Sequence, residues 1–171
     1  MKPLKRFVPL DKSLHDRPAF DCGKTALNQF LAKQAAKHMQ LGISATYVLP
    51  TSGKTENSLK AIASFYTLSM GEISRNSLPN TKKFPHYPVP VIVLARLAVD
   101  KQIQGRGYGD ITLIKAIRHS AKVSKALPAY AIVLDIKDKQ ARRFYERFPD
   151  FKPLMDQSTR LFLPIKIAQK I

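Results

Sequence analysis

The sequence has too few cysteines for a disulfide cross-link and no apolar segment long enough to anchor it in a membrane. Its 171 residues include a single cysteine, Cys22, so no disulfide can form within the chain. It contains no run of about 18 apolar residues of the kind that spans a bilayer. No apolar segment of signal-peptide length follows the basic stretch Met1–Arg6. We therefore expect a protein of a reducing compartment, the cytoplasm, with no membrane association.

The sequence also lacks the spacing that is typical of metal ligands. Its four histidines have no cysteine or carboxylate companions in a recognised pattern, so we expect no metal site and assign these histidines surface or structural roles: His15, His38, His86 and His119. Nothing places a histidine beside Cys22, which we expect to be a small core or turn residue rather than a nucleophile.

Acidic residues are scarce. There are 12 Asp and Glu against 29 Lys and Arg, which gives a formal net charge of +17. The excess is spread over the whole chain, with 14 basic and 6 acidic residues in 1–100 and 15 and 6 in 101–171. Such a surface attracts polyanions through salt-sensitive contacts. Nucleic acid, an acidic protein and a phosphate-rich cofactor all remain open on charge alone.

A hydrophobic fraction of 44% in 171 residues favours one folded domain over 1–171. The patterns predict helices over Lys24–Met39, from Gly109 onward and over Lys139–Phe148, and strands over Ser44–Leu49, Leu59–Met70, Val91–Val99, Ala129–Ile136 and Thr159–Ile165. The turn Pro50–Ser58 makes the first two strands a hairpin, and Pro164 indicates an edge strand. We expect the face of the second helix that carries Ile111, Ile114, Ile117 and Ala121 to be buried.

Two basic features stand out within these elements. Lys33 and Lys37 lie four residues apart on the exposed side of the first helix. This pair is either a contact for nucleic acid or an ordinary solvated helix face. Arg96 interrupts the apolar strand Val91–Val99, so its side chain must reach a rim, a partner or a ligand.

Three glycines follow the apolar strand and precede the second helix, in the sequence Gln-Gly-Arg-Gly-Tyr-Gly at 104–109. Glycines permit backbone angles closed to other residues, and the free N–H groups at a helix start bind phosphate oxygens. A structural strand-to-helix turn uses glycine too, so the pattern alone is a weak signal. The segment is not a Walker loop, because no Gly-Lys-Ser or Gly-Lys-Thr follows.

In this context the sequence resembles the GNAT acyltransferases, whose acetyl-CoA-binding motif is Gln/Arg-x-x-Gly-x-Gly/Ala. The resemblance covers nearly the whole chain and is strongest to the GNAT toxins of bacterial toxin–antitoxin modules. It is carried by Phe20–Gly23, Leu27–Leu31, Pro88–Val91, Leu94–Asp100, Gln104–Gly109, Ala141–Tyr145 and Leu161–Leu163. It implies an α+β fold, with a central mixed, mostly antiparallel twisted sheet flanked by helices.

The resemblance also implies an activity and its partners. These toxins acetylate the α-amino group of aminoacyl-tRNA and so block translation. Their partners are ribbon–helix–helix antitoxins, through which they reach operator DNA, and they are frequently dimers.

Carried onto this chain, the resemblance assigns roles to individual residues. Tyr145 matches the catalytic tyrosine that donates a proton to the departing CoA thiolate. Acetyl-CoA would be held by the strand backbone and the glycine loop, that is by Leu97, Ala98, Val99, Gln104, Gly105, Arg106, Gly107, Tyr108 and Gly109. Lys33, Lys37 and Arg96 are our candidates for contact with the tRNA backbone. Without the resemblance, Tyr145 would be read as a core aromatic beside Phe144 and Phe148.

Some positions depart from the family pattern. Asp110, Tyr108 and Asp135 stand where other residue types are common, and the turn Phe148–Phe151 is one residue longer than usual. Two alternatives to the toxin hypothesis remain open: a GNAT enzyme that modifies a small amine or a protein N-terminus, and a nucleic-acid-binding module whose cofactor loop is vestigial.

Overall fold

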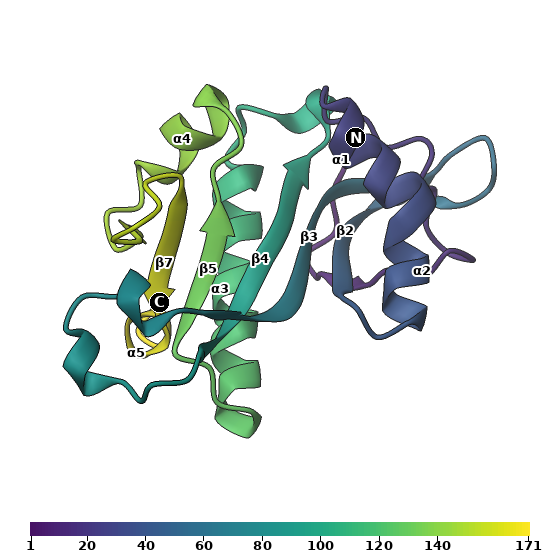
Figure 1. The fold of residues 1–171 in the computed structure, drawn as a ribbon. Coiled ribbons are helices and arrows are strands. Elements are labelled where there is room, and N and C mark those ends of the chain that lie inside the picture. Colours follow the sequence, from purple (N-terminus) through teal and green to yellow (C-terminus); the bar gives the residue numbers. More distant parts are fainter. The chain divides into compact units, whose positions relative to one another are not determined.

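The structure, a computed structural model, describes residues 1–171 as seven strands in one mixed sheet with helices packed against them (Figure 1). The strands are β1 (Val8–Pro9), β2 (Ala45–Lys54), β3 (Lys60–Ile73), β4 (Val89–Val99), β5 (Ala131–Asp135), β6 (Lys152–Pro153) and β7 (Arg160–Pro164). The α-helices are α1 (Thr25–Gln29), α2 (Ala35–Gln40), α3 (Tyr108–Ala126), α4 (Lys139–Tyr145) and α5 (Ile165–Ala168). The π-helical turn η1 (Phe30–Gln34) joins α1 to α2, and short 3₁₀ turns are η2 (Arg75–Ser77), η3 (Thr81–Lys83) and η4 (Lys101–Ile103). None of the helices is both long enough and apolar enough to span a bilayer.

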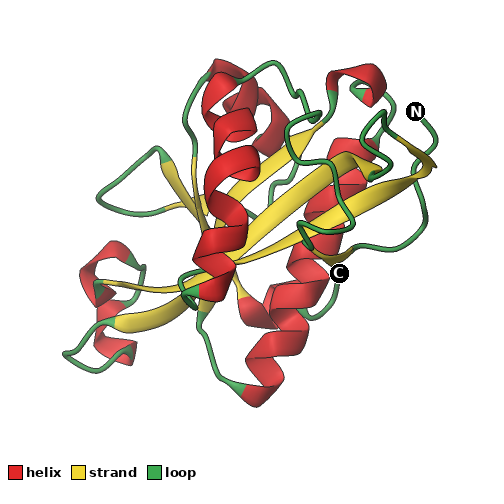
Figure 2. Ribbon diagram, turned by 90° about the vertical axis from the view of Figure 1, so that its right-hand side faces the viewer, coloured by secondary structure: helices red, strands yellow, loops and turns green.

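The strand order is β1-β2-β3-β4-β5-β7-β6. β1–β2, β2–β3, β5–β7 and β6–β7 are antiparallel, whereas β4 and β5 are parallel and are connected through α3. This confirms the predicted hairpin, and it places the second predicted helix between two parallel strands as a β-α-β unit. Figure 2 distinguishes the helices from the strands by colour. The fold class expected from the resemblance, α+β with a mostly antiparallel mixed sheet, is the one found.

The chain forms two compact units. The first comprises residues 1–69 and 96–115, and the second comprises 70–95 and 116–171. The core of the first unit packs the α1–α2 segment against β2 and β3, with Phe30, Leu31, Ala35, Val48 and Phe65 all buried. The core of the second unit gathers apolar side chains of β4, β5 and β7, including Val91, Val133 and Phe162.

The first predicted helix forms over the expected range, but with an unexpected π turn. The Ala35 N–H donates to the Phe30 carbonyl five residues back, and the Ala32 carbonyl accepts a hydrogen bond from Arg17 Nη1 at 3.0 Å. π turns of this kind are frequent at functional sites. Gly42, with φ +71°, follows the last turn, in the left-handed conformation typical of a residue just after a helix.

Four local predictions are wrong in detail. Ile111 is 50% exposed, because the buried face of α3 is formed by Leu113, Ala116 and Ile117. β2 continues to Lys54, beyond the predicted start of the turn at Pro50, because Pro50 sits at a shift in the β2–β3 register where its missing N–H is tolerated.

The other two errors concern the C-terminal elements. α4 ends at Tyr145 rather than Phe148, since Pro149 disfavours helical angles at the residue before it. β7 is not the edge strand, because β6 pairs with it at Leu161 and Phe162. Pro164 lies beyond the part of β7 that β6 covers and is opposite Ala131 of β5.

Candidate active site

The predicted cofactor loop connects the end of β4 to the start of α3. Gly105 and Gly107 have φ values of +74° and +82°, in the left-handed region that disfavours side chains. A Cβ atom added at either position would meet nothing within 4 Å, so backbone conformation and not crowding requires glycine here. Both residues are exposed. The loop thus presents its main chain to solvent.

The start of α3 offers hydrogen-bond donors to an anion. The Ile111 N–H donates to the Gly107 carbonyl at 3.1 Å as the first helical bond, so the amides before it lie ahead of the helical ladder. The helix dipole favours negative charge at this end, and the exposed Arg106 adds a cation. Asp110, in the first turn of α3, carries a negative charge and so repels an anion bound at this end. The chemistry of this loop suits the pyrophosphate of CoA. The Tyr108 ring instead packs with Leu49, Val99 and Ile103.

The Gln104 side chain holds the loop in place. Its Nε2 donates to the Val99 carbonyl at 2.8 Å and to the Cys22 carbonyl at 2.9 Å. The end of β4, the loop and the segment before α1 are therefore tied together by one amide. This makes Gln104 a positioning residue for the glycine turn, a contribution distinct from direct contact with acetyl-CoA.

Two aspartates reinforce this connection, and the sequence analysis assigned neither a role. The buried Asp100 accepts from the amide of Gln102 at 2.9 Å and from the amide of Asp21 at 3.2 Å. Asp21 accepts from the Gly23 amide and from Asn28 Nδ2, and it forms an ion pair with Lys101. The hydrogen bond from Lys101, with these amide donors, lowers the pKa of Asp21 to about 2. The motifs Phe20–Gly23 and Leu94–Asp100, both quoted for the resemblance, contain these aspartates but do not show that they meet.

The strand predicted to hold the pantetheine arm ends beside this loop. β4 and β5 are in register only at Val91–Val93, so the parallel ladder stops before Leu97, Ala98 and Val99. A strand edge without ladder bonds can pair with an extended, amide-containing ligand. Ala98 and Val99 are buried and Leu97 is half-buried. The backbone of this segment, and not its side chains, is therefore what a ligand could use.

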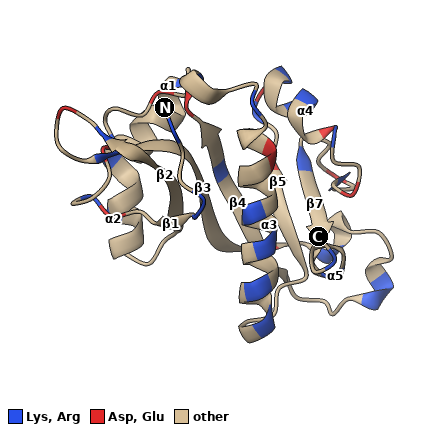
Figure 3. Ribbon diagram, turned by 180° about the vertical axis from the view of Figure 1, so that it is seen from behind, with Lys and Arg blue, Asp and Glu red and all other residues tan.

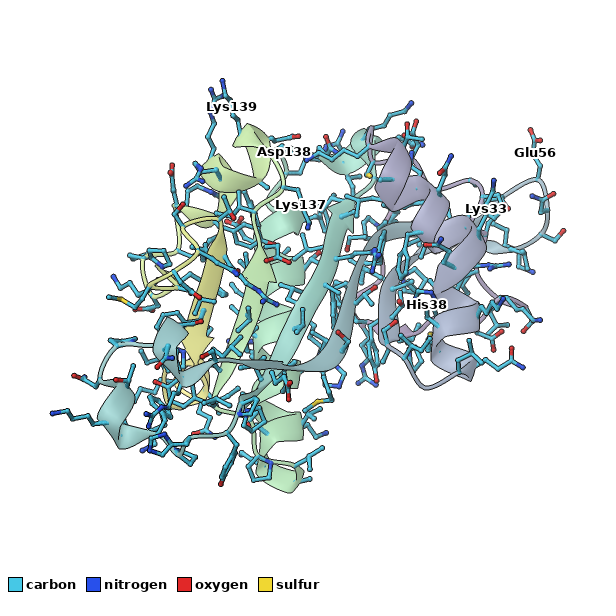
Figure 4. The ribbon with its side chains drawn as sticks, viewed as in Figure 1. Lys33, His38, Glu56, Lys137, Asp138 and Lys139 are labelled. Carbon is cyan, nitrogen blue, oxygen red and sulfur yellow. The ribbon has the colours of Figure 1, made fainter.

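Arg96 finds its partner in an aromatic ring. Its guanidinium carbon lies 3.6 Å from the centre of the Phe30 ring, which is itself 2% exposed. No carboxylate pairs with Arg96, and burial lowers the pKa of its guanidinium. Lys33 and Lys37 are exposed on η1 and α2, the segment that also carries Phe30. Figure 4 labels Lys33 on this segment. The three predicted tRNA-contact residues thus belong to one compact unit, the first.

Tyr145 is the last residue of α4. Asp138 caps this helix, its Oδ1 accepting from the Ala141 amide at 2.8 Å (Figure 4). The Tyr145 side chain is 8% exposed and its ring meets Phe144 and Phe151 edge-on, at 5.0 and 6.1 Å between centroids. Burial raises the pKa of its hydroxyl well above 10. Tyr145 therefore keeps its proton at neutral pH and can act as a donor but not as a base.

The predicted site residues divide between the two units. All of the predicted cofactor and tRNA residues lie in the first unit, and Tyr145 lies in the second. Asp135, one of the departures from the family pattern, forms an ion pair with Arg160 opposite it in the β5–β7 ladder, at 3.2 Å. His15 is buried, its Nδ1 accepting from the Asp11 amide at 3.0 Å, so it has a structural role. The side chains form no cluster of three or more His, Cys, Asp or Glu that could hold a metal ion.

Comparison with known proteins identifies the family. Residues 73–149 match the family model described as Acetyltransferase (GNAT) family. A tRNA-acetylating toxin of Mycobacterium tuberculosis is 33% identical over 159 residues, covering 91% of this chain and 90% of the relative. A probable toxin TacT of Sinorhizobium fredii is 29% identical over 178 residues, covering 98% of this chain and 95% of the relative.

Solved structures extend the similarity to the whole fold. The crystal structure of a tyrosine-to-phenylalanine mutant of KacT has a TM-score of 0.87 at 29% identity, covering 96% of this chain and 97% of KacT. AtaT complexed with acetyl-methionyl-tRNAfMet has a TM-score of 0.82 at 28% identity, covering 94% of this chain and 95% of AtaT. The chain therefore belongs to the GNAT family of acetyltransferases, in the group formed by these toxins.

Proposed function

We propose that this protein is a toxin that transfers the acetyl group of acetyl-CoA to the α-amino group of aminoacyl-tRNA and thereby inhibits translation. The observation that carries the proposal is the similarity, over 91% of the chain, to a relative that is a tRNA-acetylating toxin. AtaT, of the same fold, is known in complex with acetyl-methionyl-tRNA, the product of such a reaction. The basic surface of this chain suits a substrate that carries many phosphates.

In this proposal the glycine loop and the end of β4 hold acetyl-CoA. The amides of the turn from Gly105 to Gly109 bind the pyrophosphate, and Arg106 adds charge. Gln104 keeps the turn in its left-handed conformation through Val99 and Cys22. The backbone of Leu97–Val99 pairs with the pantetheine arm. AtaTR, a complex of AtaT at 26% identity to this chain, has been solved with acetyl-CoA bound.

The chemistry needs little help from a base. An α-amine has a pKa of about 7.7–8.0, so a substantial fraction is neutral at pH 7, unlike a lysine amine at about 10.4. The neutral nitrogen attacks the thioester carbonyl, the C–N bond forms, the C–S bond breaks, and the proton lost by the amine balances the one gained by the thiolate. Tyr145, protonated because burial raises its pKa, donates toward the departing sulfur.

We further propose the partners of this toxin and its organisation. A ribbon–helix–helix antitoxin would neutralise it in the cytoplasm and bring it to operator DNA, and two copies would form a homodimer. KacTA, the complex of a relative with 29% identity, has been solved on DNA. We also treat residues 1–171 as one GNAT domain, because β3, β4 and α3 each contribute residues to both compact units. One cooperative unfolding transition is expected.

The test is incubation of the protein with acetyl-CoA and a mixture of charged tRNAs, followed by mass analysis of the amino acids released from the tRNA. N-acetylated amino acid from at least one isoacceptor is expected. Acetylation of free amines or peptides alone would favour the small-amine alternative. Binding of tRNA without any transfer would favour the non-catalytic module. Absence of acetylated aminoacyl groups on every isoacceptor would reject the toxin activity.

A further inference from the structure

Short connections at both ends of α4 attach this helix to the sheet, and both of them lead to β7. Before the helix, Asp135 ends β5 and lies opposite Arg160, the first residue of β7. After the helix, the chain forms β6, which pairs with β7 directly after Arg160. All of these elements belong to the second compact unit. Figure 1 shows α4 at the end of the sheet where β5 ends and β7 begins.

Arg160 is bonded to the chain on both sides of α4. On the side before the helix, its Nε lies 3.2 Å from Oδ1 of Asp135. The neighbouring Thr159 carbonyl accepts a hydrogen bond from the Ile136 amide at 2.7 Å. On the side after the helix, the Arg160 carbonyl accepts from the Leu154 amide at 2.8 Å. One residue of β7 therefore connects the two segments between which α4 lies.

The ion pair between Arg160 and Asp135 is partly shielded from water. The Arg160 side chain is 27% exposed, and its Nε atom is buried and makes no hydrogen bond, so Asp135 compensates its charge. Lys137 also faces Asp135, at 3.9 Å, but its side chain is 80% exposed. Exposed pairs of this kind are screened and contribute little, whereas partly buried pairs are screened much less. Figure 3 shows basic and acidic residues together around α4 and the adjoining end of β7.

The path from this ion pair to Tyr145 is short and stiff. Only two residues separate Asp135 from Asp138, whose side chain caps α4 through the Ala141 amide. The helix has seven residues, about 10 Å along its axis, and Tyr145 is the last of them. The Tyr145 ring then packs against Phe151, which directly precedes β6. A shift of the end of β5 against β7 would therefore move Tyr145.

We infer that Arg160, acting through Asp135, is a positioning residue for Tyr145; this inference rests on the proposed function, in which Tyr145 donates a proton to the CoA thiolate. A donor works within hydrogen-bond reach of its acceptor, and a misplacement of about 1 Å can cost about 100-fold in rate. Loss of the ion pair should lower kcat. Binding of acetyl-CoA should not change, because the proposed cofactor residues belong to the first unit.

The test compares Arg160→Gln with the matched control Lys137→Gln, since each variant removes one cation that faces Asp135. Release of the CoA thiol gives kcat, and calorimetry gives the Kd for acetyl-CoA. We expect Arg160→Gln to lower kcat by about tenfold or more, with the Kd within about twofold of the wild type. Lys137→Gln should leave both within about twofold.

A second comparison separates positioning from a general loss of structure. In a Tyr145→Phe background the acid is already absent, so adding Arg160→Gln should lower kcat by less than about twofold. Wild-type kcat in Arg160→Gln would overturn the inference, and so would a full tenfold loss added to that of Tyr145→Phe. Should Arg160→Gln fail to fold, Asp135→Asn removes the same ion pair at its more exposed partner, 43% exposed, and gives the same comparisons.

Hydrogen exchange measured by mass spectrometry needs no substrate and tests the structural step alone. The α4 amides over 139–145 should exchange faster in Arg160→Gln than in the wild type or in Lys137→Gln. Equal exchange in the three proteins would overturn the inference. If the wild-type protein acetylates no aminoacyl-tRNA, the proposed function fails, and the exchange comparison still decides whether Arg160 holds α4. If transfer occurs and Tyr145→Phe keeps full turnover, the proposed function stands and the positioning role fails.

Discussion

The Arg96 guanidinium stacks on the Phe30 ring, with 3.6 Å between the guanidinium carbon and the ring centre. Phe30 opens the π turn η1, and Arg96 directly precedes the β4 residues proposed to hold the acetyl-donor arm. The contact joins the helical segment that carries Lys33 and Lys37 to the sheet. It also holds a partly buried cation, without a carboxylate partner, beside the proposed cofactor strand.

Replacement of Arg96 by lysine should separate charge from stacking. Lysine keeps the positive charge but lacks the planar group that lies on the ring. We expect Arg96→Lys to lower the free energy of unfolding by about 1 kcal/mol, measured by urea denaturation. The kcat/KM for aminoacyl-tRNA should fall, while the KM for acetyl-CoA should stay near that of the wild type. Full kcat/KM for aminoacyl-tRNA in Arg96→Ala would contradict a role in tRNA contact.

Removal of the Gln104 amide should loosen the glycine loop. The carbonyls of Val99 and Cys22 would both lose a donor, which costs about 1–3 kcal/mol where the carbonyl is left buried and unsatisfied. We expect Gln104→Ala to raise the KM for acetyl-CoA severalfold and to lower stability. The matched control is Gln102→Ala, an exposed glutamine two residues earlier. Equal effects of the two changes would argue against positioning by Gln104.

Alanine at Gly107 should strain the turn rather than crowd it. With φ +82° and no atom within 4 Å of an added Cβ, the cost is that of a left-handed non-glycine residue, about 1–2 kcal/mol. Weaker acetyl-CoA binding, measured by calorimetry, is the expected result. Gly53→Ala is the control, because Gly53 has equally open space and no left-handed backbone. Unchanged affinity in Gly107→Ala would show that the turn conformation does not matter.

The sequence predicted the features that depend on local patterns. Alternating glycines between an apolar strand and an amphipathic helix indicate a strand–turn–helix, and this is what connects β4 to α3. The hairpin, and the order of strand, helix and strand from β4 to β5, followed from the same kind of pattern. The resemblance added Tyr145, which by residue type alone would have been placed in the core, and the structure does bury it.

The features that were missed depend on residues far apart in the sequence. Asp21 and Asp100 meet across 79 positions, so no local pattern shows that they brace the loop. The π turn is accompanied by a hydrogen bond from Arg17, outside the helix, to the Ala32 carbonyl, across 15 positions. Ile111 fits the helical period but lies on the exposed side of α3, since the period does not determine which residues of a broad apolar band are buried.

The pH dependence of the rate should follow the substrate amine. The rate should rise with pH up to about 8, where the α-amine becomes neutral, and then level off. Because burial raises the pKa of Tyr145, no fall from its ionisation should occur below pH 10. The raised pKa of Tyr145 also makes its contribution to the free energy of unfolding depend on pH. A folded-state pKa above the unfolded value leaves the contribution of Tyr145 intact below pH 10, and it is lost as pH rises further.

Tyr145→Phe should abolish donation to the thiolate and preserve the ring packing against Phe144 and Phe151. We expect kcat to fall by about 100-fold or more, with an unchanged Kd for acetyl-CoA and little change in the unfolding midpoint. Stopped-flow release of the CoA thiol measures the step directly. Full turnover in this variant would show that Tyr145 is not the general acid, even if the fold and the cofactor site are correct.

The most direct measurement is the acceptor preference of the protein. Labelled acetyl-CoA is supplied with equal concentrations of aminoacyl-tRNA, the same tRNA without its amino acid, the free amino acid and a lysine-containing peptide, and the label on each is counted. The account predicts label on the aminoacyl-tRNA alone, released with the amino acid when the ester is hydrolysed. Label on the peptide or the free amino acid, with none on the aminoacyl-tRNA, would contradict it.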